Sequence, residues 1–176
     1  MDRAHLAGQH SAENLRIVGV GVYRDAKHIG MLCRDATDKR LRFIHLAFHN
    51  KLLLEEDVSK CFLWIEANLA DESASVAAAQ ARRVYRRSLS GAIPYGFAKY
   101  IGYFGPQGEI RWNAPGNGLT CATFVLAVFD SAGVHLVSGS EWPTAEQRPE
   151  DKQFQTEIIE LVRTRSNATA EYVEGM

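Results

Sequence analysis

The sequence pattern changes near residue 70, and this change constrains the fold more than any other feature. Before it, four stretches alternate apolar with polar or small side chains, which predicts β-strands. After it, residues 71–89 are rich in Ala, Gln and Arg, which favour a helix. A strand-rich half followed by a helix-rich half predicts an α+β domain. The strand candidates are residues 15–25, 28–34, 40–49 and 60–67.

The second half contains two further helix candidates. Residues 90–118 are crowded with Gly, Pro and Tyr and predict a long irregular segment with one short helix. Residues 120–133 form an apolar run of about three helical turns that ends near Gly133. Residues 152–165 carry an amphipathic helical pattern. The stretch 50–59 fits either a short strand or a loop with a helical turn.

Length and charge exclude several classes of protein. A chain of 176 residues suits one domain over residues 1–176. A net charge of −1 argues against a nucleic-acid partner, and the short basic cluster 81–87 is interpreted as a solvated helix face. No run reaches the roughly 20 apolar residues of a membrane span. The first 16 residues lack a signal-peptide pattern, so we expect a cytoplasmic protein.

Three widely spaced cysteines without a CxxC pair argue against a disulfide framework or a structural zinc site, and we expect no metal or other cofactor. Cys33 and Cys61 fall in apolar strand patterns and are interpreted as core residues. Cys121 stands where the Gly- and Asn-rich segment 116–118 leads into the apolar helix.

Cys121 therefore has two interpretations. A thiol attacks as its thiolate, whose formation is favoured by the partial positive charge of a helix N-terminus. The free N–H groups there could hold an oxyanion, with Gly118 and Thr120 open to a substrate. Alternatively, Cys121 is a small core residue.

His45, in the strand 40–49, is the candidate base, although a histidine in mid-strand is often a satisfied core residue. Strand alternation places it on one face with Phe43 and Ala47. If residues 42–48 pair with 61–67, then Glu66 lies opposite His45 and orients its ring.

Alternatives for the orienting residue stay open. If the hairpin is tight at His49 and Asn50, Glu55 takes the place of Glu66, and His49 or Asn50 could also serve. A metal site using His45, His49 and a cysteine is weaker, because the strand-like composition argues against a helical His pair and no HExxH pattern is present.

The order of these segments resembles the circularly permuted branch of the NlpC-type papain-like cysteine hydrolases, the YiiX-like and lecithin retinol acyltransferase-like group. The residues that carry the resemblance are "FIHLAFH", "FLWIEA", "GAIPYGF" and "LTCATFVLAVF", spread over roughly residues 41–129. In that branch the base histidine precedes the cysteine. This sequence departs from that branch at two positions. Many members have a glycine two residues after the histidine, where this chain has Ala47, and an acidic residue after the Pro-Tyr pair, where this chain has Gly96.

The resemblance implies a papain-like fold, with an antiparallel sheet packed against the helix that carries the cysteine. It implies Cys121 as nucleophile, His45 as base and Glu66 as orienting residue, with Tyr95 lining the site. The expected activity is hydrolysis or acyl transfer at an amide, ester or thioester bond of a small-molecule, peptide (including peptidoglycan-peptide) or lipid-like substrate. The alternative is an inactive binding domain on the same scaffold, with tyrosines of 95–103 and Trp112 as its recognition surface.

Overall fold

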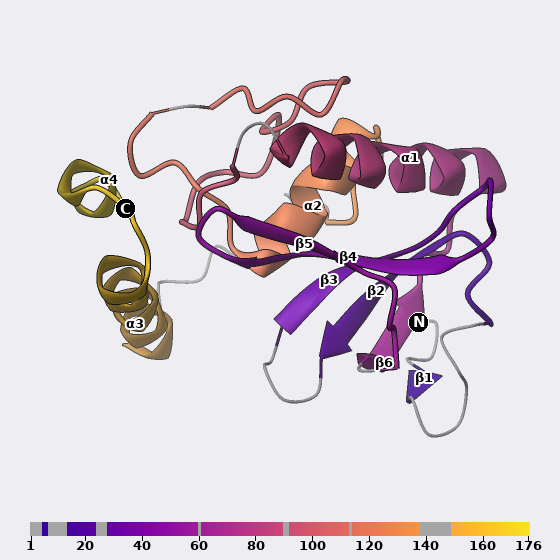
Figure 1. The fold of residues 1–176 in the computed structure, drawn as a ribbon, viewed down its shortest axis with the longest axis horizontal. Helices are drawn as coiled ribbons and strands as arrows, with labels where there is room; N and C mark the ends of the chain where they lie inside the picture. The colour runs from indigo at the N-terminus through magenta and orange to yellow at the C-terminus, as the bar shows by residue number, and fades with distance from the viewer. Residues whose placement is uncertain are drawn as a thin grey trace.

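The computed structural model describes residues 5–6, 14–23, 28–59, 61–89, 92–112, 114–137 and 149–176, without the side chains of residues 5, 6, 23, 61 and 62. Its first half forms a six-stranded antiparallel sheet with the order β1-β6-β2-β3-β4-β5 (Figure 1). The strands are β1 His5–Leu6, β2 Val18–Tyr23, β3 His28–Arg34, β4 Leu41–Phe48, β5 Lys51–Glu55 and β6 Cys61–Glu66. Residues 24 and 25 of the first predicted strand lie outside the described part.

In the part of the chain that the structure describes, four helices follow the sheet. They are α1 Asp71–Ser88, α2 Cys121–Ser131, α3 Pro149–Arg165 and α4 Ala170–Glu174. The α+β class and the three predicted helices are confirmed. Between α1 and α2 the described chain is irregular and carries two isolated bridges, Tyr95 to Leu119 and Phe104 to Ile110, in place of the short helix expected there.

The expected pairing of residues 42–48 with 61–67 is wrong. β4 instead pairs with β5 through a tight hairpin at His49 and Asn50, where Asn50 has a φ of 58°. β6 pairs with β2 and β1 on the other side of the sheet. The physical reason lies in Leu52 and Leu54, which have the two-residue spacing of a strand and pack against the core on one face of β5.

The two faces of the sheet have different neighbours. α1 and α2 lie on the same side of it (Figure 1), where Ile44 and Leu46 of β4 join Phe124 and Val128 of α2 in the main core. The other face carries a smaller apolar cluster that includes Phe43. Because successive side chains of a strand point to opposite faces, His45 faces away from α2.

Gly30 of β3 makes room for the side chains on that second face. A Cβ atom at this position would lie 2.6 Å from the Cβ of His45 and 2.6 Å from the ring of Phe43. Real Cβ atoms do not approach so closely, so only glycine fits under these two rings. The sequence of β3 thus determines how His45 lies against the sheet.

Candidate functional site

Cys121 is the first residue of α2, directly after the N-cap residue Thr120. The Thr120 hydroxyl accepts a hydrogen bond from the Thr123 backbone N–H at 3.1 Å, and the Thr123 hydroxyl accepts one from the Thr120 N–H at 2.8 Å. This reciprocal capping box fixes the first turn of the helix. Cys121 is partly exposed, so the thiol lies at a well-formed helix N-terminus with access to solvent.

Tyr95 lies against Cys121. Its hydroxyl interacts with both the side chain and the main chain of Cys121, and burial, with the charge of Cys121 next in importance, raises the pKa of Tyr95. The side chain is 6 % exposed, and its ring lies 5.9 Å from that of Phe48, the last residue of β4. Tyr95 therefore lies beside Cys121 and close to the end of β4.

Gly118 lies in the segment that leads to Cys121, where the main chain pairs closely with residues 94–98. A Cβ atom here would meet the Tyr172 hydroxyl, the Pro94 carbonyl and the Gly96 nitrogen, all within 2.7 Å. Leu119 donates its N–H to the Pro94 carbonyl at 3.0 Å. The small size of Gly118 is therefore needed for packing between two main-chain segments, whereas we expected it to open the site to a substrate.

His45 forms the centre of a hydrogen-bonded chain on the second face of the sheet. Its Nε2 lies 3.0 Å from Oε1 of Glu55, and its Nδ1 lies 2.7 Å from Nε2 of His28. The His45 residue is 3 % exposed. Three titratable side chains from three neighbouring strands, β3, β4 and β5, thus lie in one line.

The donor and acceptor roles in this series of hydrogen bonds follow from the carboxylate at one end of it. A carboxylate can only accept, so His45 donates from Nε2 to Glu55 and its Nδ1 is an acceptor. His28 must then donate from Nε2 to His45, which leaves its own Nδ1 without a partner among the described residues. Both imidazoles are neutral in this arrangement, and His28 Nδ1 is the one basic nitrogen left for a proton from outside.

Burial supports the neutral forms. Desolvation and the neighbouring His45 lower the pKa of His28 to about 4, against a smaller raising effect of Glu55. Desolvation also lowers the pKa of His45, and its hydrogen bond to Glu55 partly offsets this. At neutral pH both rings are therefore uncharged.

Glu66 does not lie beside His45, so the preference for Glu66 as its orienting partner is wrong and Glu55 occupies that position. β6 is separated from β4 by β2 and β3 in the sheet. Glu66 instead pairs with Arg16, Nε to Oε1, at 2.9 Å near the surface. The carboxylate that orients His45 comes from the strand that the tight hairpin brings next to it.

The structure does not bring His45 and Cys121 together. His45 lies on the face opposite α2, and no interaction among the described residues joins its ring to the thiol. The two groups nevertheless lie toward the same end of the sheet, because β3 begins at His28 beside the end of the antiparallel β4 at Phe48. The histidine chain and the Tyr95–Cys121 pair thus lie at the same end of the sheet, on its two faces.

His28 is the site residue that our sequence reasoning missed. The signal for it was Gly30, two residues after the histidine, which is the spacing that "IHLAF" lacks after His45. His28 opens a predicted strand and shares a face with Gly30, and this pattern could have identified it.

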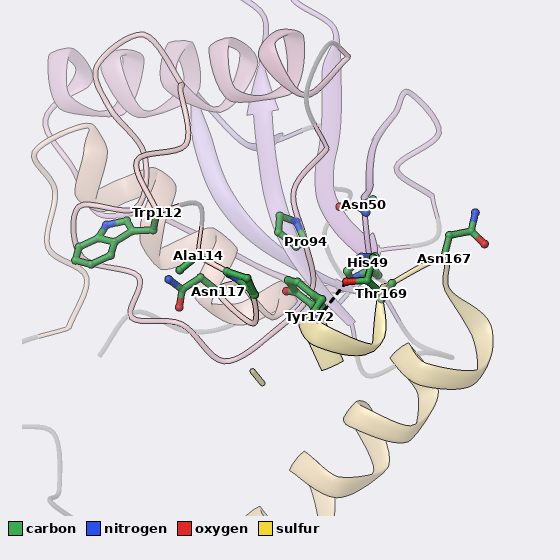
Figure 2. A pocket seen from close by; sticks show the side chains of 11 residues that line it. His49, Asn50, Pro94, Trp112, Ala114, Asn117, Asn167, Thr169 and Tyr172 are labelled. Atoms are coloured by element: carbon green, nitrogen blue, oxygen red, sulfur yellow. Dashed lines mark hydrogen bonds between the residues drawn. The ribbon is translucent and has the colours of Figure 1, made fainter. Parts of the chain in front are cut away.

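A groove of about 330 Å³ lies beside the chain segment that leads to Cys121 (Figure 2). Figure 2 shows His49, Thr169 and Tyr172 grouped at its centre, with Trp112 toward one end and Asn167 toward the other. The Tyr95 N–H donates to His49 Nδ1 at 3.4 Å, so His49 keeps Nε2–H as a donor, and burial lowers its pKa. Cys121 does not line the groove.

Of the other two cysteines, the structure describes the side chain of Cys33 alone. Cys33 is buried, and desolvation raises the pKa of its thiol to about 12, so it is a core thiol as predicted. The Cys61 side chain lies outside the described residues. Within the described ranges no group of three or more His, Cys, Asp or Glu side chains is placed to hold a metal ion, and the alternative metal site of His45 and His49 gains no support.

Comparisons with protein-family models, with curated proteins and with solved structures find no match to this chain. Among the described residues no helix has the length and apolar character needed to cross a bilayer. The fold defines the class of the protein as an α+β domain with an antiparallel sheet.

Proposed function

We propose that the protein is a thiol hydrolase or acyltransferase in which Cys121 attacks the carbonyl carbon of an amide, ester or thioester. The observation that carries this proposal is the position of Cys121 at the capped N-terminus of α2 with the Tyr95 hydroxyl against it. The helix end and a hydroxyl donor both stabilise a thiolate more than a thiol. The resemblance to the permuted NlpC-type branch supports the same role.

The proposed base is the chain Glu55–His45–His28, with His28 at its outer end. His28 Nδ1 takes the thiol proton, and His45 and Glu55 hold the ring and share the charge that develops. His28, which has Gly30 two residues after it, fits the pattern of the NlpC-type branch better than His45 does. Because the chain and Cys121 lie on two faces at one end of the sheet, catalysis requires a rearrangement that brings the thiol to His28.

The proposed reaction has two steps. The Cys121 sulfur forms a bond to the carbonyl carbon, backbone N–H groups at the start of α2 hold the oxyanion, and the leaving group departs with the proton from His28. Water or another acceptor then gives its proton to His28 and attacks the thioester, which releases the acyl group and the thiol. The groove with His49 and Trp112 is the proposed binding surface for the substrate beyond its carbonyl.

Alkylation kinetics test this proposal. Iodoacetamide should modify Cys121 at least tenfold faster than Cys33 at pH 7, because the latter is buried with a raised pKa. Cys121→Ala should abolish hydrolysis of p-nitrophenyl acetate and of a thioester probe, whereas Cys33→Ala should keep it. A Cys121 that reacts no faster than Cys33, or ester hydrolysis that survives Cys121→Ala, rules the proposal out.

A catalytically inactive binding domain is the second candidate, and one observation favours it: the His45 ring faces away from the helix that carries Cys121. The two candidates differ in what His28 does. For an enzyme, His28→Gln should shift the pH dependence of Cys121 alkylation and slow turnover of an ester. For a binding domain, the alkylation profile should be the same in His28→Gln and in the unaltered protein.

A further inference from the structure

A second cavity, of about 190 Å³, lies at the opposite end of β3 from His28, between α1 and the turn that follows β3. Its charged lining consists of four basic residues and one acidic residue, namely Arg16, Arg34, Lys39, Arg82 and Asp35. Positive charge is therefore in excess around this cavity, although the whole chain has a net charge of −1. Such an excess favours an anionic ligand.

Arg82 provides the observation that points to a ligand. Its Nη1 is buried and has no hydrogen-bond partner among the residues that the structure describes. The nearest acidic contact of its guanidinium is long, 3.8 Å from Nε to Asp35 Oδ2. A buried charged donor without an acceptor is unfavourable, and the few that occur call for a specific explanation.

The other charges do not use up this excess. Asp35 is shared with Arg42, whose Nη1 lies 3.3 Å from Asp35 Oδ2, the oxygen that also faces Arg82. Arg34 donates to two neutral carbonyls, of Leu15 at 2.8 Å and of Lys39 at 2.7 Å, and these bonds fix its guanidinium in place. Arg16 has two acidic partners, Glu66 and Asp71, so the positive charge available to a ligand is that of Lys39 and Arg82.

We propose that this cavity binds a phosphate-type oxyanion, either inorganic phosphate or the phosphate group of a small molecule. Ser75 and Arg82 lie two turns apart on the same face of α1, so both can donate into one space. A tetrahedral oxyanion offers enough acceptors for Arg82 Nη1, the Ser75 hydroxyl and the Lys39 ammonium together, whereas a single carboxylate offers two oxygens. The site does not depend on the chemistry proposed for Cys121.

The binding test uses the unaltered full chain, with inorganic phosphate and glycerol 3-phosphate as probes. Titration calorimetry and backbone amide NMR, at an ionic strength held constant with NaCl, should show saturable binding with shifts concentrated in residues 34–39 and 75–82. Equal binding of both probes assigns the site to the free anion, and tighter binding of the ester assigns it to an organic phosphate. Acetate that binds as tightly as phosphate, or shifts that NaCl alone reproduces, overturns the proposal.

Two variants and a control make the test specific. Arg82→Gln should weaken phosphate binding at least tenfold, whereas Arg86→Gln, an exposed arginine in the last turn of the same helix, should stay within twofold of the unaltered protein. Equal loss in both variants contradicts the site. Should Arg82→Gln fail to fold, Lys39→Asn decides: Lys39 is exposed with a φ of 60°, which Asn accepts, and its loss should weaken binding at least threefold. Unchanged affinity in Lys39→Asn then rejects the proposal.

Discussion

His45 Nε2 lies 3.0 Å from Glu55 Oε1, across a hairpin that turns at His49 and Asn50. The bond joins a histidine that is 3 % exposed to a carboxylate on the edge strand β5. It sets the tautomer of His45, and through His45 it sets the donor role of His28. One cross-strand contact thus determines which nitrogen of the chain is free to take a proton.

Glu55→Ala should lower the free energy of unfolding by about 1–2 kcal/mol, because it leaves a buried ring nitrogen of His45 without its acceptor. Glu66→Ala is the matched control. Its ion pair joins side chains of Glu66 and Arg16 that are 28 % and 61 % exposed, and its loss should cost less than about 1 kcal/mol. Urea denaturation of both variants measures the difference. A loss from Glu66→Ala as large as that from Glu55→Ala contradicts the structure.

The lowered pKa of His28 predicts how stability depends on pH. The folded protein holds this pKa near 4, whereas the unfolded chain has the ordinary value of 6.5, so acid protonates the unfolded state first. The free energy of unfolding should therefore fall as the pH drops from about 6.5 to about 4, and His28 should add no further loss below that window. His28→Gln, which keeps an N–H donor for His45, should flatten this slope in denaturation curves recorded from pH 7 to pH 4. An unchanged slope would show that His28 is not the group responsible.

Tyr95→Phe should slow the alkylation of Cys121 at neutral pH by about threefold to tenfold, because the variant lacks the hydroxyl that interacts with the thiol. Iodoacetamide rate constants, followed by mass spectrometry of the Cys121 peptide, provide the measurement. Tyr100→Phe is the control, since Tyr100 is a half-buried tyrosine of the same irregular segment. Equal rates in the unaltered protein and in Tyr95→Phe would remove Tyr95 from the site.

Thr120→Ala should lower the free energy of unfolding by about 1 kcal/mol, because the capping box at the start of α2 loses its N-cap oxygen. Fraying of this turn should also change the alkylation rate of Cys121, the residue that follows. Thr164→Ala serves as the control, because the Thr164 hydroxyl bonds to the Glu160 carbonyl within the exposed part of α3. Denaturation curves that move equally for both variants would show that the cap has no special weight.

Local patterns predicted the elements of this fold well. The alternation in 40–49 and the alanine-rich run 71–89 correspond to β4 and α1, within a few residues at their ends. The edge strand β5 was left open, because its five residues are too few to separate a strand from a loop by periodicity. The pairing of strands was not predictable in this way, since it depends on which hairpin closes, and both closures gave His45 a carboxylate.

The residues of the candidate site also differ in how far local patterns predict them. Cys121 at a helix N-terminus follows from short-range signals, namely Thr120, the glycines before it and the apolar run after it, whereas Tyr95 was expected in the site only through the resemblance. The role of His28 depends on a contact with His45 across two strands, and the choice of Glu55 over Glu66 depends on the order of strands in the sheet. Neither relationship is present in any short stretch of residues.

Short-range patterns predicted most of the helices and strands, the position of the thiol at the start of α2 and the face of β4 on which His45 lies, because propensity, capping and strand alternation act over a few residues. Which side chains meet depended on the packing of whole elements. The β4–β5 hairpin brought Glu55 to His45, and the pairing of β3 with β4 added His28. Because α1 and α2 pack on one face of the sheet, these three hydrogen-bonded side chains lie on the other face. The reason is physical: contacts between distant residues depend on how whole strands and helices bury their apolar faces together, and no local pattern records that choice.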